Sequence, residues 1–286
     1  MSLYLGTNVT IQWCMITEGC AKFVDGVNTG HRFAGIWGNE YGTYHHNLIA
    51  HNASRTPRWA SGGRWNDYRN NVLYNWDYQS CYGGEKEDPN GRASWDFFTV
   101  NMVANYYKYG PATDSGVRSR IAQPSARSAD DKGGWYVSDN YVDGYPAVTS
   151  DNWLGVSGNN GIKLNQQWSA MPINQQTPQA AYTSVLAHAG CSKPNRDSVD
   201  TRIVNEVATG TAAYGDNGII TFPSDVGGWP VLAPGVPSTD TDHDGMPDTW
   251  ETAHSLNPNN AADRNNYTLS PNYTNLEVYL NELGAF

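Results

Sequence analysis

Short runs of alternating polar and apolar residues fill the first half of the chain, and polar loops separate them. Alternation with a period of two, with β-branched and aromatic residues at the apolar positions, predicts short β-strands that turn one face inward. A similar segment recurs along this region, as Tyr44–His51, Tyr68–Asn75, Met102–Lys108 and Val137–Asp143. The corresponding asparagines, Asn47, Asn71, Asn105 and Asn140, are 24, 34 and 35 residues apart.

A repeat of this length predicts a solenoid, in which each repeat contributes one turn and buries its inner face against the next. Asparagines at the same place in each turn are expected to stack, with their side-chain amides hydrogen-bonded along the axis. An antiparallel sandwich is the alternative, but Asn-Gly hairpin signals between the alternating runs are nearly absent. The prediction is therefore an all-β fold, a β-helix whose turns occupy residues 1–175.

Two helices are expected after the repeats. Residues 178–190 begin with proline and end with glycine, and residues 197–209 place Val199, Ile203, Val204 and Val207 on one face. These helices are expected to pack on the solenoid within an irregular segment, residues 176–235, which ends in an extended linker at 227–237. Residues 236–286 form a small tail.

The tail carries a motif with the spacing of a calcium-binding EF-hand loop. Positions 1, 3, 5, 9 and 12 of this loop are acidic, and they are Asp240, Asp242, Asp244, Asp248 and Glu251. Ca²⁺ prefers six to eight hard oxygen ligands, and alternate carboxylates on a tight loop converge on one point. Gly245 permits the sharp turn, and Met246 can offer its carbonyl oxygen. A helix is expected at 248–255, and the capping box Thr274–Glu277 begins the last helix. The segment before the loop is not helical, so the motif resembles the half-hand of dockerins or thrombospondin repeats.

Composition excludes several classes of protein. Charged residues make up 16% of the 286 residues, too few for a helical bundle, and 12% aromatic residues exclude wholesale disorder. The net charge of −10 argues against binding to nucleic acid or to an anionic membrane. We expect neither a transmembrane helix nor a signal peptide, because the chain shows no long apolar run and no charged start. The four cysteines leave disulfides and free thiols equally open.

Positive charge nevertheless concentrates in residues 31–70. Five arginines, Arg32, Arg55, Arg58, Arg64 and Arg69, face only Glu40 and Asp67, and four of the seven histidines lie here as well. Because arginine binds carboxylates through two parallel hydrogen bonds, an acidic ligand is one explanation. Pairing of each arginine with a structural carboxylate or carbonyl group is the other.

The same region resembles the core of the pectate lyases of polysaccharide lyase family 1. The resemblance rests on residues 35–38, 44–51 and 54–58, and its most specific part is the Arg-x-Pro segment that follows His-His-Asn. Residues 66–76, 82–85, 105–112 and 190–197 continue the match, which covers nearly the whole chain. The acidic tail is similar to one that many bacterial members carry.

The resemblance implies a right-handed parallel β-helix that cleaves polygalacturonate by β-elimination. It implies that Arg55 removes the C5 proton, that Pro57 shapes the turn, and that Arg58 holds a substrate carboxylate. Calcium is expected to bridge the substrate to acidic side chains and to stabilise the enolate-like intermediate. On general grounds a histidine is the easier base at neutral pH. The remaining predicted substrate contacts are Arg32, His46 and His51, with interior packing as the alternative for the two histidines.

The match begins at an internal turn of the family's solenoid, so the turns that carry the active-site calcium ligands have no counterpart in this sequence. Two functions therefore stay open. The first is a calcium-dependent pectate lyase that gives 4,5-unsaturated oligogalacturonides. The second is a non-catalytic, pectin-binding or structural β-helix fragment. A hydrolase of the polygalacturonase type is disfavoured, because Glu40 and Asp67 are the only carboxylates near the arginines. The resemblance also implies an acidic polysaccharide partner, a secreted, cell-surface or periplasmic location, and a monomer.

Overall fold

The computed structural model describes residues 1–88, 91, 96–193, 195–232 and 235–284. The chain divides into two compact units, Met1–Pro230 and Val231–Phe286. The boundary between them falls inside the predicted linker at 227–237. The two units are described separately below.

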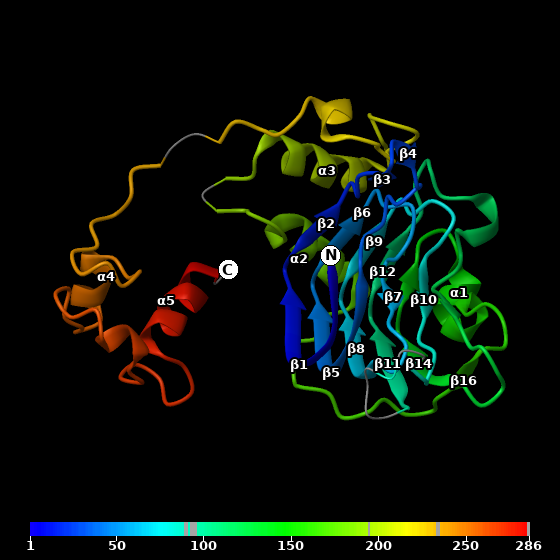
Figure 1. Cartoon of the computed structure of the whole chain (residues 1–286), viewed down its shortest axis with the longest axis horizontal. Helices are drawn as coiled ribbons and strands as arrows, with labels where there is room; N and C mark the ends of the chain where they lie inside the picture. Colours follow the sequence, from blue (N-terminus) through cyan, green and yellow to red (C-terminus); the bar gives the residue numbers. More distant parts are fainter. Residues whose placement is uncertain (89–90, 92–95, 194, 233–234, 285–286) are drawn as a thin grey trace. The chain divides into compact units, whose positions relative to one another are not determined.

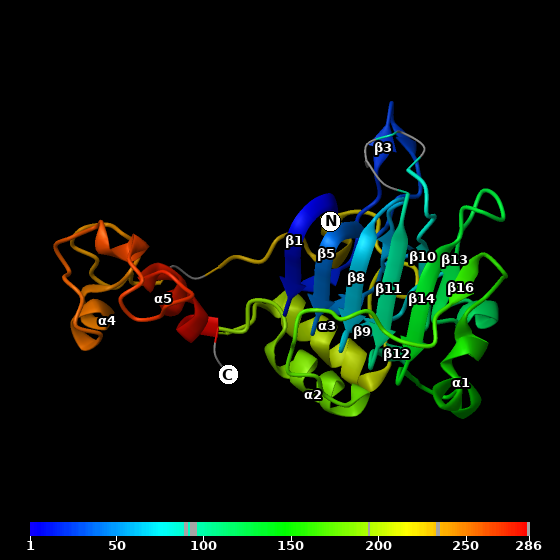
Figure 2. The ribbon, with the colours of Figure 1, turned by 90° about the horizontal axis from the view of Figure 1, so that it is seen from below.

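The first unit contains a nine-stranded parallel sheet (Figure 1). Its strands are β1 (Ser2–Gln12), β5 (Ile36–His45), β7 (Arg58–Trp59), β8 (Arg64–Arg69), β10 (Cys81–Gly83), β11 (Phe98–Val103), β13 (Ala122–Pro124), β14 (Gly133–Ser138) and β16 (Gly161–Lys163). The strands β1, β5, β8, β11, β14 and β16 lie side by side in that order (Figure 2).

A second parallel sheet has five strands in the order β15, β12, β9, β6, β2. They are β2 (Met15–Thr17), β6 (Leu48–Ala50), β9 (Val72–Tyr74), β12 (Tyr106–Lys108) and β15 (Tyr141–Val142). The chain alternates between the sheets, so that β5, β8, β11 and β14 are each followed by one strand of the second sheet. Leu48 pairs with Val72, Val72 with Tyr106, and Tyr106 with Tyr141. These partners have the same spacings of 24, 34 and 35 residues as the repeated asparagines. The prediction of parallel strands is confirmed, and the antiparallel sandwich is wrong for these two sheets.

The asparagine ladder is present, and from Asn71 onward each Oδ1 atom accepts two hydrogen bonds from the preceding asparagine. Asn71 accepts from the backbone N–H of Asn47 at 3.0 Å and from its side-chain amide at 2.9 Å. The same pair of bonds joins Asn71 to Asn105 and Asn105 to Asn140. The ladder continues to Asn152, which the sequence analysis did not predict. The four predicted members are at most 1% exposed, so the ladder satisfies the buried backbone at the turn between the two sheets.

The interior between the sheets is filled mainly by aromatic side chains. Trp37 stacks on Tyr44 with ring centroids 5.0 Å apart, and Trp59 meets Tyr68 edge to face at 5.8 Å. All four rings are fully buried. Each large ring contributes a large apolar contact area. This burial explains how sheets that include strands of only two or three residues are stabilised.

Two helices cover the second sheet, as Figure 1 shows: α2 (Pro178–His188) and α3 (Ser198–Thr209). Thr177 and Asp197 cap their first turns, and Gly210 ends α3 in the left-handed conformation with φ 75°. Val185, Ile203 and Val207 are buried against strand residues of β6 and β9. Both predicted helices are therefore confirmed. The remaining helices of this unit are η1 (Ser115–Val117), α1 (Pro146–Ser150), η2 (Asn152–Gly155) and η3 (Pro223–Val226).

Two short strands form a hairpin outside the sheets, β3 (Phe23–Val24) and β4 (Val27–Asn28). Asp25 and Gly26 join them with φ of 49° and 78°, the conformation that a tight two-residue turn requires. The four cysteines are free thiols. Among the described residues, no helix combines the length and the apolar character needed to span a membrane.

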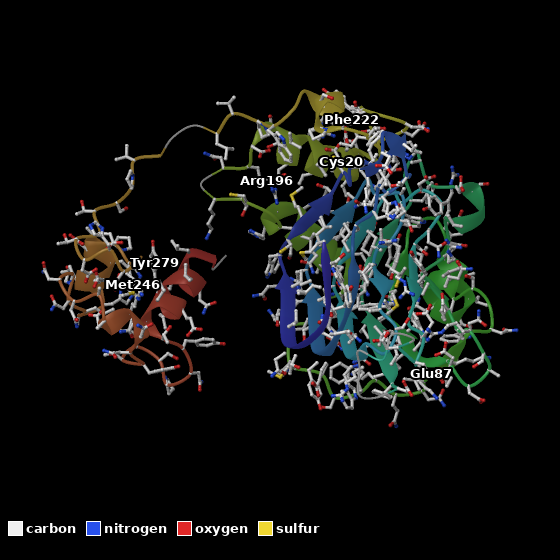
Figure 3. The ribbon with its side chains drawn as sticks, in the orientation of Figure 1. Cys20, Glu87, Arg196, Phe222, Met246 and Tyr279 are labelled. Atoms are coloured by element: carbon white, nitrogen blue, oxygen red, sulfur yellow. The ribbon has the colours of Figure 1, made fainter. Side chains whose placement is uncertain are left out.

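The C-terminal unit contains α4 (Asp248–Ala253), η4 (Asp263–Asn265) and α5 (Asn275–Gly284). Thr274 and Glu277 form the predicted capping box, because the backbone N–H of Thr274 donates to Glu277 at 2.7 Å and the N–H of Glu277 donates back to Thr274 at 3.3 Å. Figure 3 labels Met246 of the acidic loop and Tyr279 of α5 in this unit.

Candidate functional site

Arg55 lies in the loop that leads into β7, and its backbone is in the left-handed region with φ 61°. Its carbonyl oxygen accepts a hydrogen bond from Gly35 at 2.9 Å, and its guanidinium carbon lies 4.5 Å from the ring centroid of Phe33. A cis peptide bond joins the next two residues, Thr56 and Pro57. The buried Nε atom of Arg55 has no hydrogen-bond partner in the protein. Among the described residues no carboxylate pairs with it, so its charge remains available to a ligand.

Arg32 lies on the neighbouring turn, since its carbonyl oxygen accepts a hydrogen bond from Ala53 at 2.7 Å. An isolated parallel β-bridge joins Phe33 to Ser54. Arg32 and Arg55, which are next to these two residues in sequence, therefore lie in the same part of the surface. One Nη atom of Arg32 donates to Thr221 at 3.1 Å, while its Nε is buried without a partner. Arg32 is therefore a second guanidinium that no described carboxylate pairs.

A polar cleft of about 500 Å³ opens beside Arg32. Residues from three distant loops line it, among them Asp77, Asp114, Arg118, Asp216 and Thr221. Burial raises the pKa of Asp77, the nearby Asp114 and Asp216 raise it further, and Arg32 opposes them. The cleft thus has an acidic wall as well as arginines. A uronic acid chain would be repelled by that wall unless a cation lay between them.

Arg58, predicted to hold a substrate carboxylate, is paired within the protein. One of its Nη atoms donates to both carboxylate oxygens of Glu85, at 3.0 and 3.1 Å, and the other donates to the carbonyl oxygen of Trp59. Ser61 also donates to Glu85, at 2.9 Å. A substrate carboxylate would have to displace Glu85 to reach this guanidinium.

His46 is buried beneath the segment that leads into α2. Its ring stacks on Trp13 with centroids 4.4 Å apart, and its ring nitrogens contact His45 at 2.8 Å and Gln176 at 3.2 Å. Burial lowers the pKa of His46 and brings the pKa of His45 to about 4, helped in His45 by the charges of His46 and Arg69. Both rings are therefore neutral at neutral pH, and these contacts fit interior packing.

His51 has no exposed surface. Its Nε2 lies 3.0 Å from a carboxylate oxygen of Glu206 on α3, and its Nδ1 lies 3.0 Å from the amide of Asn75. Arg202 also donates to Glu206, at 3.1 Å, and reaches Glu18 at 2.7 Å. This network joins α3 to the strands, so His51 holds the helix in place and does not reach the surface.

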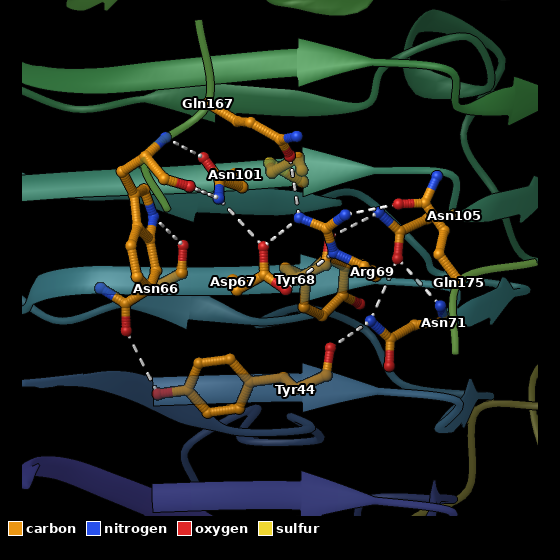
Figure 4. A network of polar contacts seen from close by, with 12 residues as sticks. Tyr44, Asn66, Asp67, Tyr68, Arg69, Asn71, Asn101, Asn105, Gln167 and Gln175 are labelled. Atoms are coloured by element: carbon orange, nitrogen blue, oxygen red, sulfur yellow. Dashed lines mark hydrogen bonds and ion pairs between the residues drawn. The ribbon is translucent and has the colours of Figure 1, made fainter. Parts of the chain in front are cut away.

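A second buried pair lies on the outer side of β8, where Arg69 donates to both oxygens of Asp67 (Figure 4). Gln167 and Gln175 accept from Arg69, and Asn101 donates to Asp67 at 3.0 Å. The structural alternative for the arginine-rich region therefore holds for Arg58 and Arg69. It also holds for Arg64, which pairs with Glu40.

The predicted calcium loop brings its carboxylates together. Oxygen atoms of Asp240, Asp242 and Asp244 lie within 4.8 Å of one another, which is close enough to share a metal ion. A second such group consists of Asp244, Glu251 and Asp263, all three buried. Burial raises the pKa of Glu251 to about 7, and the charges of Asp242, Asp244 and Asp263 raise it too. Uncompensated negative charge of this kind fits a hard cation bound by oxygen ligands.

Asp248, the predicted ligand at position 9, belongs to neither of these two groups of carboxylates. Its two carboxylate oxygens accept hydrogen bonds from the backbone N–H and the hydroxyl of Thr241, both at 2.7 Å. These bonds lower the pKa of Asp248. Asp263 lies outside the twelve-residue motif, so the spacing of the loop does not predict it. No sequence motif predicts the acidic wall of Asp77, Asp114 and Asp216 either, because only the fold brings these residues together.

Comparison with known proteins finds relatives over nearly the whole chain. The probable pectate lyases C of Aspergillus flavus and Aspergillus terreus are each 32% identical over 97% of this chain. The probable pectate lyase C of Aspergillus fumigatus is 31% identical over 97% of it. In each case the chain spans 60% of the length of the relative. No protein-family model matches the chain. The chain thus resembles fungal pectate lyases along nearly all of its sequence.

Proposed function

We propose that the first unit is a right-handed parallel β-helix and that it acts as a pectate lyase on polygalacturonate. The parallel pairing of successive turns supports the fold, and the names of the Aspergillus relatives support the activity. The observation that carries the site is the pair of guanidinium groups on neighbouring turns, Arg32 and Arg55, neither of which forms an ion pair with a described carboxylate. Both have a buried Nε without a protein partner.

In this proposal Arg55 is the base. Only the small neutral fraction of Arg55, which has lost one proton to solvent, can act as the base. Its unprotonated nitrogen takes the C5 proton of a galacturonate, and the electron pair forms the C4–C5 double bond as the C4–O bond breaks. The leaving oxygen takes a proton from solvent. Arg32 binds a substrate carboxylate and stabilises the charge that develops beside it.

The described residues of the first unit do not form a calcium site of their own. Within the described residues, both groups of three acidic side chains that could share a metal ion lie in the C-terminal unit. The wall formed by Asp77, Asp114 and Asp216 contains no such group, so these residues do not fit a calcium site held by the protein alone, and no step above passes through calcium. Calcium dependence is therefore an outcome that the assay decides.

We also propose that the acidic loop of the C-terminal unit binds Ca²⁺ and that this site is structural. Asp240, Asp242, Asp244 and Glu251 supply carboxylate oxygens, and Met246 is the predicted carbonyl ligand. All are hard oxygen donors of the kind that Ca²⁺ prefers. Asp248 is engaged by Thr241 and is at most an indirect ligand.

The proposal also covers the partner, the location and the oligomeric state of the enzyme. An acidic polysaccharide is the partner, the protein is a secreted monomer, and neither nucleic acid nor membrane is involved. The competing function is a non-catalytic pectin-binding or structural β-helix. The acidic wall of the cleft and the pairing of Arg58 with Glu85 favour this alternative, because both reduce the positive charge open to substrate.

The deciding experiment incubates the chain with polygalacturonate, with calcium or with a chelator. Ultraviolet absorbance follows the unsaturated product, and a reducing-end assay runs in parallel. A lyase gives both signals together. Reducing ends without absorbance would mean hydrolysis, and neither signal with retained binding to polygalacturonate would leave the binding function.

A further inference from the structure

The buried side chains of the C-terminal unit are almost all polar. Among its described residues, Met246 is the one buried hydrophobic residue. The others are Asp244, Glu251, Asp263 and Asn275. Residues 231–286 contain eight acidic residues and a single basic one, Arg264. A segment of this length with so little apolar burial lacks the driving force to fold by itself.

The buried carboxylates also lack partners. Both oxygens of Glu251, both of Asp242, Oδ2 of Asp244 and Oδ1 of Asp263 are buried without a hydrogen-bond partner in the protein. Glu251 is 0% exposed and Asp244 is 2% exposed. A buried, unpaired carboxylate costs several kcal/mol of folding free energy. Each of these carboxylates therefore opposes folding of the unit unless a cation compensates its charge.

Asp263 is held in place by the second half of the unit. Its Oδ2 accepts a hydrogen bond from the backbone of Asn257 at 3.2 Å, and its carbonyl oxygen accepts one from the side chain of Asn275 at 2.9 Å. Asn275 is the first residue of α5, and its backbone N–H donates to Asn266 at 2.8 Å. The remaining oxygen of Asp263, Oδ1, is the one without a partner, and the side chain groups with Asp244 and Glu251.

We propose that Asp263 is a direct calcium ligand from outside the twelve-residue loop, and that the bound ion is the core around which this unit folds. The inference rests on the calcium loop proposed above and extends it. The loop supplies Asp240, Asp242, Asp244 and Glu251, and Asp263 closes the site from the η4 turn. One ion therefore ties the loop and α4 to η4 and, through Asn275, to α5.

The first test measures Ca²⁺ binding to the full chain by calorimetry, without polygalacturonate, for the parent and for two matched variants. Asp263→Asn removes the proposed ligand and keeps the side-chain shape, whereas Asp248→Asn removes a carboxylate that the structure assigns to Thr241. We expect Asp263→Asn to weaken affinity by at least about tenfold, as the loss of a metal-site carboxylate should, and Asp248→Asn to weaken it far less.

The second test follows folding of the unit by trypsin. Arg264 is the only lysine or arginine after Arg202, so cleavage in this unit releases residues 265–286, which intact mass identifies. We expect Ca²⁺ at 100 times its Kd to slow this cleavage by about a hundredfold relative to a chelator. In Asp263→Asn the protection should return only at higher Ca²⁺, which separates weakened binding from a unit that cannot fold.

The outcomes separate the two proposals. A parent chain that binds no Ca²⁺ would overturn the calcium loop itself. A parent that binds while Asp263→Asn binds equally well would overturn only the role of Asp263. Binding that leaves cleavage at Arg264 unchanged would overturn the claim that the ion organises the fold.

Discussion

The side-chain oxygen of Asn105 accepts two hydrogen bonds from Asn71, one from its backbone N–H at 2.9 Å and one from its side-chain amide at 3.0 Å. The amide of Asn105 in turn donates to the carbonyl oxygen of Tyr68 at 3.0 Å and to Asn140 at 2.9 Å. Because Asn105 is 0% exposed, water cannot replace these bonds without opening the turn.

Asn105→Ala should therefore destabilise the first unit strongly. The substitution removes four buried hydrogen bonds, two that Asn105 accepts from Asn71 and two that its amide donates, and it leaves the backbone N–H of Asn71 without this partner. We therefore expect a loss of about 3 kcal/mol. Guanidinium unfolding followed by near-ultraviolet circular dichroism measures it, because the buried aromatic rings report on this unit. Asn160→Ala, at an exposed position, is the control and should change little. A loss below about 1 kcal/mol for Asn105→Ala, roughly the value of one ordinary hydrogen bond, would show that the ladder is dispensable.

Arg55→Lys tests the proposed base. The fold should persist, because the side chain makes no hydrogen bond or ion pair within the described part of the chain, and turnover should fall by at least about a hundredfold. The initial rate of absorbance increase on polygalacturonate gives kcat, and thermal unfolding checks the fold. Arg118→Lys is the matched control, since Arg118 lines the cleft beside Arg32 and donates to the carbonyl oxygen of Thr113. Full turnover by the Arg55 variant would remove Arg55 from the mechanism.

Arg58→Gln tests whether this arginine is structural or available to substrate. The substitution leaves the buried carboxylate of Glu85 with Ser61 as its remaining side-chain donor, so we expect stability to fall by about 1–3 kcal/mol. A double-mutant cycle with Glu85→Gln measures the coupling between the two residues. A variant with unchanged stability but a raised KM would instead place Arg58 in the substrate site.

The pH dependence of stability should reveal Asp131. Burial raises its pKa, but hydrogen bonds from the side chain of Arg127 and from the backbone N–H groups of Glu87 and Arg127 outweigh burial and bring it to about 2. Since this lies below the ordinary value of 3.8, the native state favours the ionised form, which stabilises the fold at neutral pH by roughly 2 kcal/mol.

That contribution is fully present above about pH 4 and is lost as the pH falls towards 2. Asp131→Asn should therefore lower the unfolding free energy at pH 7 and flatten its fall over this acid range. Urea unfolding at a series of pH values gives both quantities. If the parent and the variant lose stability in parallel between pH 4 and 2, Asp131 does not carry this effect.

The sequence by itself determined the local elements and their order. The Asn47, Asn71 and Asn105 spacing predicted stacked turns, because a repeat can bury its inner face only against its neighbours. Pro178 and Gly190 indicated α2, an apolar face that includes Ile203 and Val207 indicated α3, and the Thr274–Glu277 capping box placed the start of α5. These signals act over a few residues, so they are legible without a fold.

The tertiary structure decided which charges meet. Arg58 and Arg55 are three residues apart, yet one faces Glu85 and the other faces no described carboxylate, because Glu85 lies on the next turn. The sequence predicted His51 as a substrate contact, with interior packing as the alternative. In the structure α3 places Glu206, more than 150 residues away in sequence, against the His51 ring. Asp263 joins the acidic loop only through the η4 turn. Such pairings depend on contacts between distant segments, and local sequence does not specify them.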